Sequence, residues 1–273
     1  MNNFGIKFFV LYFSPLYYTI KGLYTHNTYK EIIQEWNLFC LKYFKFSLWR
    51  INKQDIIHKK NIMYFHNHRS ISDSLLGHIL TNYNSLSVVR LLFSFIFMPY
   101  LFFGTLSNTI ITINREGNIQ KIFETVEKNR IKNKYNNIYV FPEGTRHQGD
   151  EVRQLKKGFI YHAFEHKISI QLIITKNNEH ILNEKTFKTQ NNVKIFVYHS
   201  KELNPENFKT KEEFYKFIQT MWNKSWNKVY NTKKYKYIVP FEDKMYNNKN
   251  KILFKHKMIL PMILCIILFI IFI

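Results

Sequence analysis

Short apolar runs alternate with amphipathic stretches through the middle of the chain, between residues 61 and 230. The runs are rich in Ile, Val, Phe and Tyr and are short enough to be buried strands. They predict strands at Ile62–His66, Leu86–Arg90, Thr109–Ile113, Ile138–Phe141, Ile168–Thr175 and Val193–His199. The longer stretches predict helices at Ser72–Asn82, Ile119–Ile131, Gln154–His166 and Phe208–Tyr230. This alternation is typical of an α/β fold in which helices cover a sheet.

The N-terminal segment Phe4–Leu23 is apolar and aromatic but contains Lys7 and Lys21. No small-residue cleavage site follows it, which favours a helix that lies on or partly enters a membrane over a signal peptide. A capping box, Thr28-x-x-Glu31, predicts that a second helix begins here. The apolar residues of this helix form one stripe at helical spacing: Ile32, Ile33, Trp36, Phe39, Cys40, Tyr43 and Phe44. The stripe faces either a protein core or the membrane, and the spacing alone does not distinguish the two.

Every residue from Met258 to Ile273 is apolar, and several lysines precede this run. With Ile252–Phe254 added, the run reaches the length of a short membrane span. A buried core helix would show a polar face, which this run lacks. We therefore expect a C-terminal transmembrane tail anchor. The lysines before it predict that residues 24–250 face the cytosol. We expect the membrane to be that of the endoplasmic reticulum.

The segments together predict three regions: membrane-associated helices at 1–50, an α/β domain at 51–240 and a transmembrane anchor at 252–273. A hydrophobic content of 46% is enough for a sizeable core and excludes a disordered or collagen-like chain. The net charge of +21 suits a polyanionic partner such as nucleic acid, a phosphorylated metabolite or an anionic membrane. An AT-rich coding sequence would raise the lysine content in the same way, so the charge does not select among these. Cys40 and Cys265 are too few for a disulfide framework.

The first group of candidate catalytic residues follows the strand Ile62–His66. His68 and Asp73 are five residues apart, on a strand-to-helix turn that can bring the two side chains together. The carboxylate can then accept from one ring nitrogen of His68, while the other nitrogen takes a proton from a hydroxyl. This is the orienting half of a catalytic triad, without a protein nucleophile. A structural histidine in the core or at the surface is the alternative.

A second group follows the strand Ile138–Phe141, where the chain reads Phe-Pro-Glu-Gly-Thr-Arg over residues 141–146. Gly144 would let the backbone approach a ligand closely, and the planar fork of Arg146 suits a phosphate. Glu143 could hold that fork or a hydroxyl in place. Arg115 follows a third strand and would share the rim with His68 if the strands are parallel. The alternative is a turn with a surface ion pair.

In this order and spacing, the blocks resemble the glycerolipid acyltransferase family, of the type that acylates lysophosphatidic acid. His68-x4-Asp73, Ile113-Asn114-Arg115, Phe141–Arg146 and Lys156-Lys157-Gly158 each match a family block, and Pro99 and Gly104 fit a turn of the family. The resemblance covers roughly residues 60–175. The family usually has a proline-containing block, associated with substrate or acyl binding, where this chain reads Ile168–Leu172.

The resemblance implies a mixed sheet flanked by helices and an acyltransferase domain at 51–240. It implies acyl transfer from acyl-CoA, as co-substrate, to the sn-2 hydroxyl of 1-acyl-sn-glycerol 3-phosphate, which forms phosphatidic acid. His68 would be the general base and Asp73 its orienting partner, and the hydroxyl would attack the thioester directly. The residues implied to hold the acceptor phosphate are Arg115, Glu143, Gly144, Thr145 and Arg146.

No metal or other cofactor is expected. The segment His162-Ala163-Phe164-Glu165-His166 spells an inverted zinc-peptidase motif, but the sequence offers no identifiable third ligand, so we expect an ordinary packed helix. The sequon at Asn223 should stay unmodified in a cytosolic domain.

Other functions remain open from the sequence. The acceptor could be another lysophospholipid or glycerol 3-phosphate, or the chain could bind phospholipid with little or no turnover. A basic nucleic-acid-binding protein is a further alternative, against which the predicted anchor argues. We therefore expect a lysophospholipid acceptor, acyl-CoA and a membrane as partners, and no nucleic acid.

Overall fold

The computed structural model describes residues 3–25, 29–90, 104, 110–114, 119–132 and 137–241. Within these residues, eight strands form one sheet in the order β4-β3-β5-β2-β6-β7-β1-β8. Its strands are β1 (Phe46–Arg50), β2 (Ile62–His66), β3 (Leu86–Arg90), β4 (Ile110–Ile113), β5 (Ile138–Val140), β6 (Ser169–Lys176), β7 (Val193–His199) and β8 (Val239–Pro240).

The sheet is mixed, as expected. Strands β2, β3, β4, β5 and β6 run parallel to one another, whereas β7 is antiparallel to β6 and β8 is antiparallel to β1. The carboxyl ends of β2, β3, β4, β5 and β6 therefore meet at one edge, where ligands bind in open sheets of this kind.

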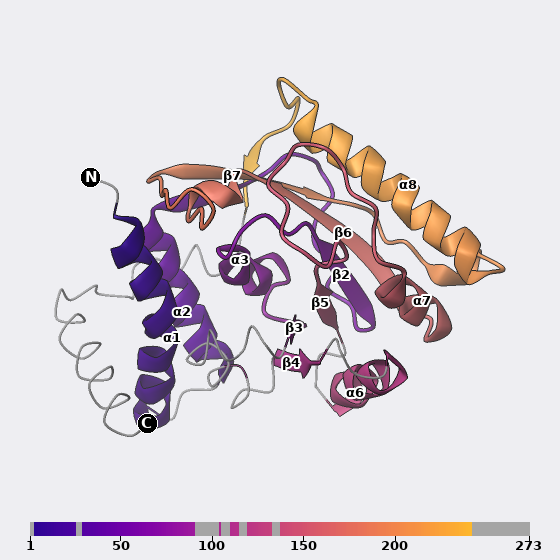
Figure 1. The fold of residues 1–273 in the computed structure, drawn as a ribbon, viewed down its shortest axis with the longest axis horizontal. Coiled ribbons are helices and arrows are strands. Elements are labelled where there is room, and N and C mark those ends of the chain that lie inside the picture. The colour runs from indigo at the N-terminus through magenta and orange to yellow at the C-terminus, as the bar shows by residue number, and fades with distance from the viewer. Residues whose placement is uncertain are drawn as a thin grey trace.

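Helices cover both faces of the sheet (Figure 1). They are α1 (Phe4–Thr25), α2 (Tyr29–Phe44), α3 (Asp73–Leu80), α6 (Ile119–Lys132), α7 (Lys157–Glu165) and α8 (Lys211–Tyr230), with short 3-10 turns at Asn178–His180 and Pro205–Asn207. One apolar cluster joins α1, α2 and α3 to the sheet, and a second joins α6, α7 and α8 to its other face. The result is a three-layer α/β/α domain.

The predicted strands and helices coincide with observed elements to within a few residues, apart from Thr109 of the third strand, which lies outside the described residues. Thr210 caps the start of α8, because its Oγ1 accepts from the backbone N–H of Glu213 at 3.2 Å. Strand β1 was not predicted. The chain leaves α2 through Lys45, whose φ of 52° is left-handed, and a lysine there gives no sequence signal for the helix end. β1 lies on the N-terminal side of the expected domain start at residue 51 but belongs to the same sheet.

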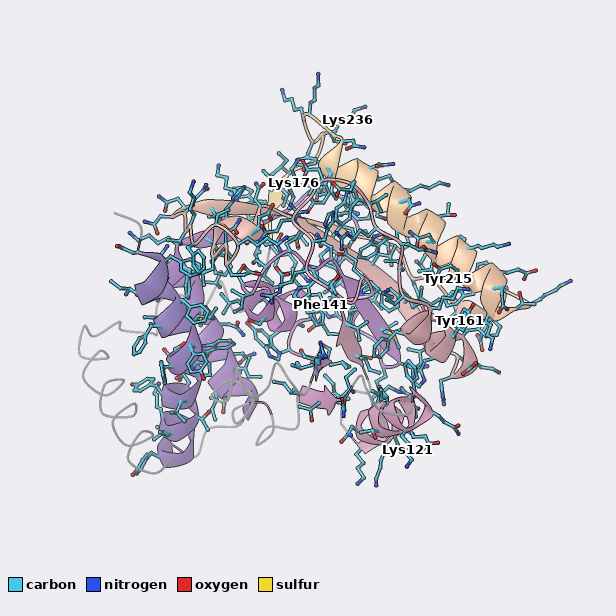
Figure 2. The ribbon with its side chains drawn as sticks, viewed as in Figure 1. Lys121, Phe141, Tyr161, Lys176, Tyr215 and Lys236 are labelled. Atoms are coloured by element: carbon cyan, nitrogen blue, oxygen red, sulfur yellow. The ribbon has the colours of Figure 1, made fainter. Side chains whose placement is uncertain are left out.

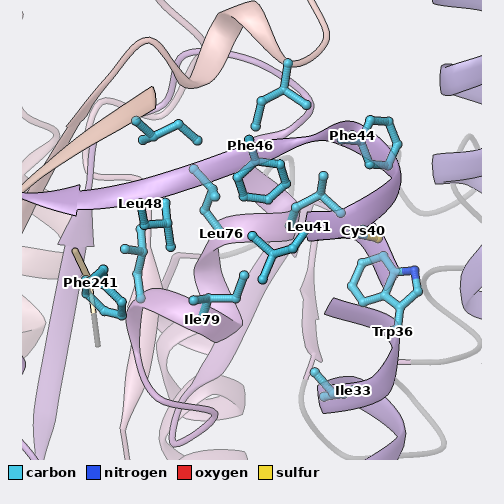
Figure 3. Packing of buried hydrophobic residues seen from close by; sticks show 14 of the residues in the cluster. Ile33, Trp36, Cys40, Leu41, Phe44, Phe46, Leu48, Leu76, Ile79 and Phe241 are labelled. Atoms are coloured by element: carbon cyan, nitrogen blue, oxygen red, sulfur yellow. The ribbon is translucent and has the colours of Figure 1, made fainter. Parts of the chain in front are cut away.

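The apolar stripe of α2 faces the protein core. Trp36, Cys40 and Phe44 are fully buried, and they pack with residues of β1 and α3 such as Phe46 and Leu76 (Figure 3). Trp36 also donates its indole N–H to Ser14 Oγ of α1 at 2.8 Å. The ambiguity between core and membrane is thus resolved in favour of the core.

Helix α1 is fixed to the domain through a buried lysine. Lys7 Nζ donates to Thr189 Oγ1 at 2.9 Å and to Asn191 Oδ1 at 2.8 Å. The outward side of α1 stays apolar, with Ile6 62% and Phe9 42% exposed. Among the described residues, no helix has the length and apolar character needed to cross a membrane. The transmembrane tail predicted at 252–273 lies outside the described residues and gains no support from the structure.

Candidate active site

The loop between β2 and α3 wraps around one carboxylate. Asp73, the first residue of α3, accepts at Oδ2 from His68 Nδ1 at 2.8 Å and from the backbone N–H groups of Arg69 and Ser70 at 2.6 and 3.0 Å. Its Oδ1 accepts from the side-chain amide of Asn178. Three residues of the loop therefore depend on Asp73 for their position, and the predicted His68–Asp73 pair is present.

Burial disfavours the charged form of Asp73, but its hydrogen bonds and the nearby His68 outweigh that cost, so the pKa of Asp73 is lowered below its usual value. The carboxylate is therefore ionised near neutral pH and accepts a hydrogen bond from His68 Nδ1–H. That assignment leaves Nε2 as the basic nitrogen of the ring.

Phe141 fixes the plane of the His68 ring. The two rings stack with centroids 3.8 Å apart and an interplanar angle of 14°. Phe141 is the residue directly after β5 and lies in the centre of the molecule (Figure 2). The block 141–146 therefore contacts His68 directly through Phe141. This contact was not predicted from the sequence. His68 keeps 22% of its side chain exposed, so a substrate can reach it.

The backbone ties the two blocks together. His147 N–H donates to the carbonyl of His68 at 2.7 Å, and Gly144 N–H closes a turn on the carbonyl of Phe141 at 3.1 Å. Gly144 has a φ of 77°, a conformation that is costly for a side chain-bearing residue. The glycine of this block is thus required by the turn that follows β5.

Glu143 is buried in an unusual way. Glu143 is only 3% exposed, and neither of its carboxylate oxygens has a hydrogen-bond partner among the described residues. Burial, together with the nearby charge of Asp73, raises the pKa of Glu143 to about 8. This carboxyl is mostly protonated at neutral pH and can donate a hydrogen bond, which a surface glutamate would not do.

Arg146 and Thr145 border the site in different ways. Thr145 is exposed, whereas Arg146 is half-buried and its Nη1 donates to Glu184 Oε1 at 2.7 Å. Glu143, which could have held the fork of Arg146, makes no hydrogen bond to it. Arg115 lies outside the described residues, although β4 ends at Ile113, on the same edge as His68.

A cavity of about 310 Å³ has His68 in its wall. Gly144, Thr145 and two arginines, Arg90 and Arg146, also line it, and much of the remaining lining is apolar. The apolar and small lining residues are Ile71, Gly77, Val88, Val89, Ile113, Val140, Phe141 and Phe159. A basic nitrogen, a cation and an apolar chamber thus meet in one cavity, a combination suited to an amphiphilic ligand.

The structure adds supporting residues that the sequence analysis missed. Arg69 is buried and donates to Glu179 Oε1 at 2.6 Å, with its guanidinium 5.0 Å from the ring centre of Tyr230. Glu184 accepts from the backbone N–H of Ile71 at 3.3 Å as well as from Arg146. Asn178, Glu179 and Glu184 all follow β6. Their only sequence signal is a polar segment directly after a buried strand.

Two other expected blocks have structural roles. Lys157-Gly158 begins α7, and a side chain at Gly158 would lie 3.1 Å from the ring of Phe123 in α6. The segment Ile168–Leu172, where the family proline is missing, belongs to the start of buried strand β6. There Gln171 accepts from the backbone N–H of Ile57 at 3.0 Å and donates to the carbonyl of Asp55 at 2.8 Å. Pro99 lies outside the described residues.

Comparisons with known proteins agree with this geometry. Residues 49–176 match the family model described as Acyltransferase. The fold is similar to the crystal structure of the 1-acyl-sn-glycerophosphate (LPA) acyltransferase, PlsC, from Thermotoga maritima, with a TM-score of 0.63 and 16% identity over 82% of this chain and 95% of that one. No match to a curated protein was found. The matched segment, residues 49–176, includes His68, Asp73 and the block 141–146, so the predicted resemblance to glycerolipid acyltransferases is confirmed for this part of the chain.

Proposed function

We propose that the protein transfers a fatty acyl group from acyl-CoA to the sn-2 hydroxyl of 1-acyl-sn-glycerol 3-phosphate and forms phosphatidic acid. The observation that carries this proposal is the His68–Asp73 pair in the wall of a cavity that is apolar inside and cationic at one side. The name of the similar Thermotoga maritima structure, a 1-acyl-sn-glycerophosphate acyltransferase, is consistent with that acceptor.

In the proposed reaction, Nε2 of His68 takes the proton of the acceptor hydroxyl while the hydroxyl oxygen attacks the thioester carbonyl carbon. The tetrahedral intermediate then collapses with cleavage of the carbon–sulfur bond. The departing thiolate takes the proton from the imidazolium, so the proton count balances and His68 is restored. Asp73 holds the ring and favours its positive charge between these two steps.

The acceptor phosphate is assigned to Arg146, with Arg115, which follows β4 in the sequence, as the second candidate. Arg146 is held near the cavity by Glu184 and presents a planar donor set to it. Glu143, protonated at neutral pH, can donate to an oxygen of the substrate without adding negative charge beside a phosphate. Thr145 and Gly144 offer a hydroxyl and backbone at the same wall.

The apolar part of the cavity is suited to a fatty acyl chain. Ile71, Val88 and Ile113 present branched side chains to it, and Gly77 widens it because a side chain there would lie 2.9 Å from the ring of Tyr139. Since both substrates are amphiphiles, a membrane-bound enzyme can take them from the bilayer. The exposed apolar side of α1 and the predicted tail support that location.

The proposal is tested with purified protein, labelled acyl-CoA and a panel of acceptors. We expect product with 1-acyl-sn-glycerol 3-phosphate, and we expect His68→Ala to lower kcat by about 10²- to 10⁴-fold, as loss of a general base does. His58→Ala, at an exposed histidine outside the cavity, is the matched control and should retain full turnover. Equal turnover by the two variants would remove His68 from the mechanism.

The same panel distinguishes the remaining possibilities. If another lysophospholipid or glycerol 3-phosphate is acylated preferentially, the assigned acceptor would change, but the assigned reaction would still be acyl transfer. Acceptor binding without product from any donor would instead identify a lipid-binding homologue.

A further inference from the structure

Outside the active site, three potential metal ligands converge between α6 and α7. Glu127 comes from α6, His162 from α7, and His166 from the residue after the end of α7. Their ligand atoms all lie within 4.8 Å of one another. His162 and His166 are four residues apart, so they occupy the same face of one helical turn, as in helical zinc motifs. They line a different cavity from the one that holds His68.

The distances between these ligand atoms are longer than an ordinary hydrogen bond and leave room for a shared cation. His162 Nε2 lies 3.4 Å from Glu127 Oε2, and His166 Nδ1 lies 3.9 Å from Glu127 Oε1. Hydrogen bonds between such groups are usually shorter, about 2.7–3.2 Å. Two ligands at about 2.0–2.1 Å from a tetrahedral zinc ion lie about 3.3 Å apart, close to the shorter of these separations.

The buried histidine lacks the partner that burial normally demands. His162 is 3% exposed, and its Nε2 has no hydrogen-bond partner among the described residues. Buried polar atoms of side chains are nearly always satisfied, so an unpartnered ring nitrogen aimed at a carboxylate and a second imidazole is a specific sign of a missing ligand.

Neighbouring residues hold the three ligands in place and leave a route by which a cation can reach them. Arg130 holds both oxygens of the Glu127 carboxylate, because its Nε donates to Oε2 at 2.9 Å and its Nη2 donates to Oε1. This ion pair orients the carboxylate, as partners of metal ligands do, and a cation would share the carboxylate with it. Phe123 stacks on the His162 ring with centroids 4.9 Å apart. A cavity of about 770 Å³ borders all three ligands and gives a cation a route of entry and space for a water ligand. The positive charge of Arg130 opposes a cation, so moderate affinity is expected.

We propose that Glu127, His162 and His166 form a binding site for a divalent transition metal of the zinc type, with water completing the coordination. The two imidazoles and one carboxylate match the ligand set of such sites. The site would join α6 to α7, the helix that begins shortly after the block 141–146. The sequence analysis expected no metal, because Glu127 lies on another helix and only the fold brings it to the two histidines.

The test uses purified full-length protein in detergent, freed of metal with a chelator and titrated with Zn²⁺ by calorimetry. We expect one Zn²⁺ per chain and a higher Tm when Zn²⁺ is bound, because a ligand that binds only the folded state stabilises it. His166→Ala removes a partly exposed ligand and should weaken binding at least 10-fold, as should Glu127→Gln. Co²⁺ in place of Zn²⁺ should give the visible absorption of a tetrahedral site.

His58→Ala is the matched control, since His58 is exposed and outside the cluster. It should bind Zn²⁺ like the unaltered protein. His162→Ala creates a cavity in the helix packing and can fail to fold, so the decision rests on the His166 variant. Absence of Zn²⁺ binding, or unchanged affinity in both His166→Ala and Glu127→Gln, would overturn the proposal. Acyl transfer is not part of the readout, so the result is independent of the proposed function.

Discussion

At the scale of single residues, two buried carboxyls of the active site behave in opposite ways. Asp73 accepts hydrogen bonds from His68, Arg69 and Ser70, and its pKa is lowered despite burial. Glu143 has no such donors among the described residues, and burial raises its pKa to about 8. Both carboxyls are buried, so the hydrogen bonds made to the charged form, and not the extent of burial, decide which one is ionised. One residue therefore orients a base, and the other is available as a neutral donor.

This difference predicts how stability depends on pH. The folded-state pKa of Glu143 is raised above its ordinary value of 4.5, so the folded protein binds more protons than the unfolded chain between about pH 4.5 and pH 8. The contribution of Glu143 to stability is therefore fully present below pH 4.5 and is lost as pH rises to about 8. At about 1.4 kcal/mol per pKa unit, the loss is on the order of a few kcal/mol.

Glu143→Gln keeps the neutral shape at every pH and should flatten the decline in the free energy of unfolding between pH 5 and pH 8. Unfolding in urea at several pH values measures this, with the exposed Glu206→Gln as control. A Gln variant with the same slope as the unaltered protein would contradict the neutral state assigned to Glu143.

At the scale of elements, the site is made by segments that follow the strands rather than by the strands themselves. His68 follows β2, Phe141 and Arg146 follow β5, and Glu184 lies beyond β6. The parallel register of β2 with β5 and β6 brings these segments to one edge of the sheet. The ion pair between Arg146 and Glu184 joins two of these segments. Arg146 therefore has two candidate roles, which are binding the acceptor phosphate and holding the two segments together.

A pair of variants separates these roles. If Arg146 binds the acceptor phosphate, Arg146→Ala should raise the acceptor KM by roughly 10- to 150-fold, the equivalent of about 1.5–3 kcal/mol, and leave the acyl-CoA KM nearly unchanged. Lysine keeps the charge but loses the planar fork, so it should restore binding only in part. Steady-state kinetics with each substrate varied in turn gives both constants.

Glu184→Gln is the matched control, because it removes the brace and keeps the guanidinium. Under the phosphate assignment it changes the acceptor KM much less than Arg146→Ala does. Should both variants instead lower the Tm and impair both substrates alike, Arg146 acts as a brace and the phosphate must be held elsewhere.

At the scale of the whole molecule, α1 and α2 form one side of the domain and not a separate module. The α2 stripe is buried against β1 and α3, and Lys7 fixes α1 to the segment 189–191. The outward side of α1 keeps exposed Ile6 and Phe9, which suits contact with a membrane surface. Lysines such as Lys236, at the top of the view, and Lys121, at the bottom, project from the surface (Figure 2).

The predicted topology can be tested on the intact chain. If residues 252–273 span the membrane and residues 24–250 face the cytosol, protease added to sealed microsomes should digest the bulk of the chain and leave a small C-terminal fragment. Protease with detergent is the control for sealing. Protection of the whole domain, or a glycan on Asn223, would contradict this orientation. Asn223 lies on α8, where its Oδ1 accepts from Gln219 at 2.8 Å.

The α/β class, most of the strands and the His68–Asp73 pair could be predicted from the sequence, because these depend on local periodicity and short spacing. The sequence could not give β1, whose start is set by a left-handed lysine and by pairing with β7, far along the chain. The buried, unpartnered state of Glu143, the Phe141–His68 stacking and the Arg146–Glu184 pair were also decided by the tertiary structure. Each depends on which strands become neighbours, and burial and contact between distant segments exist only once the sheet has formed. The same holds for Glu127 beside His162 and His166.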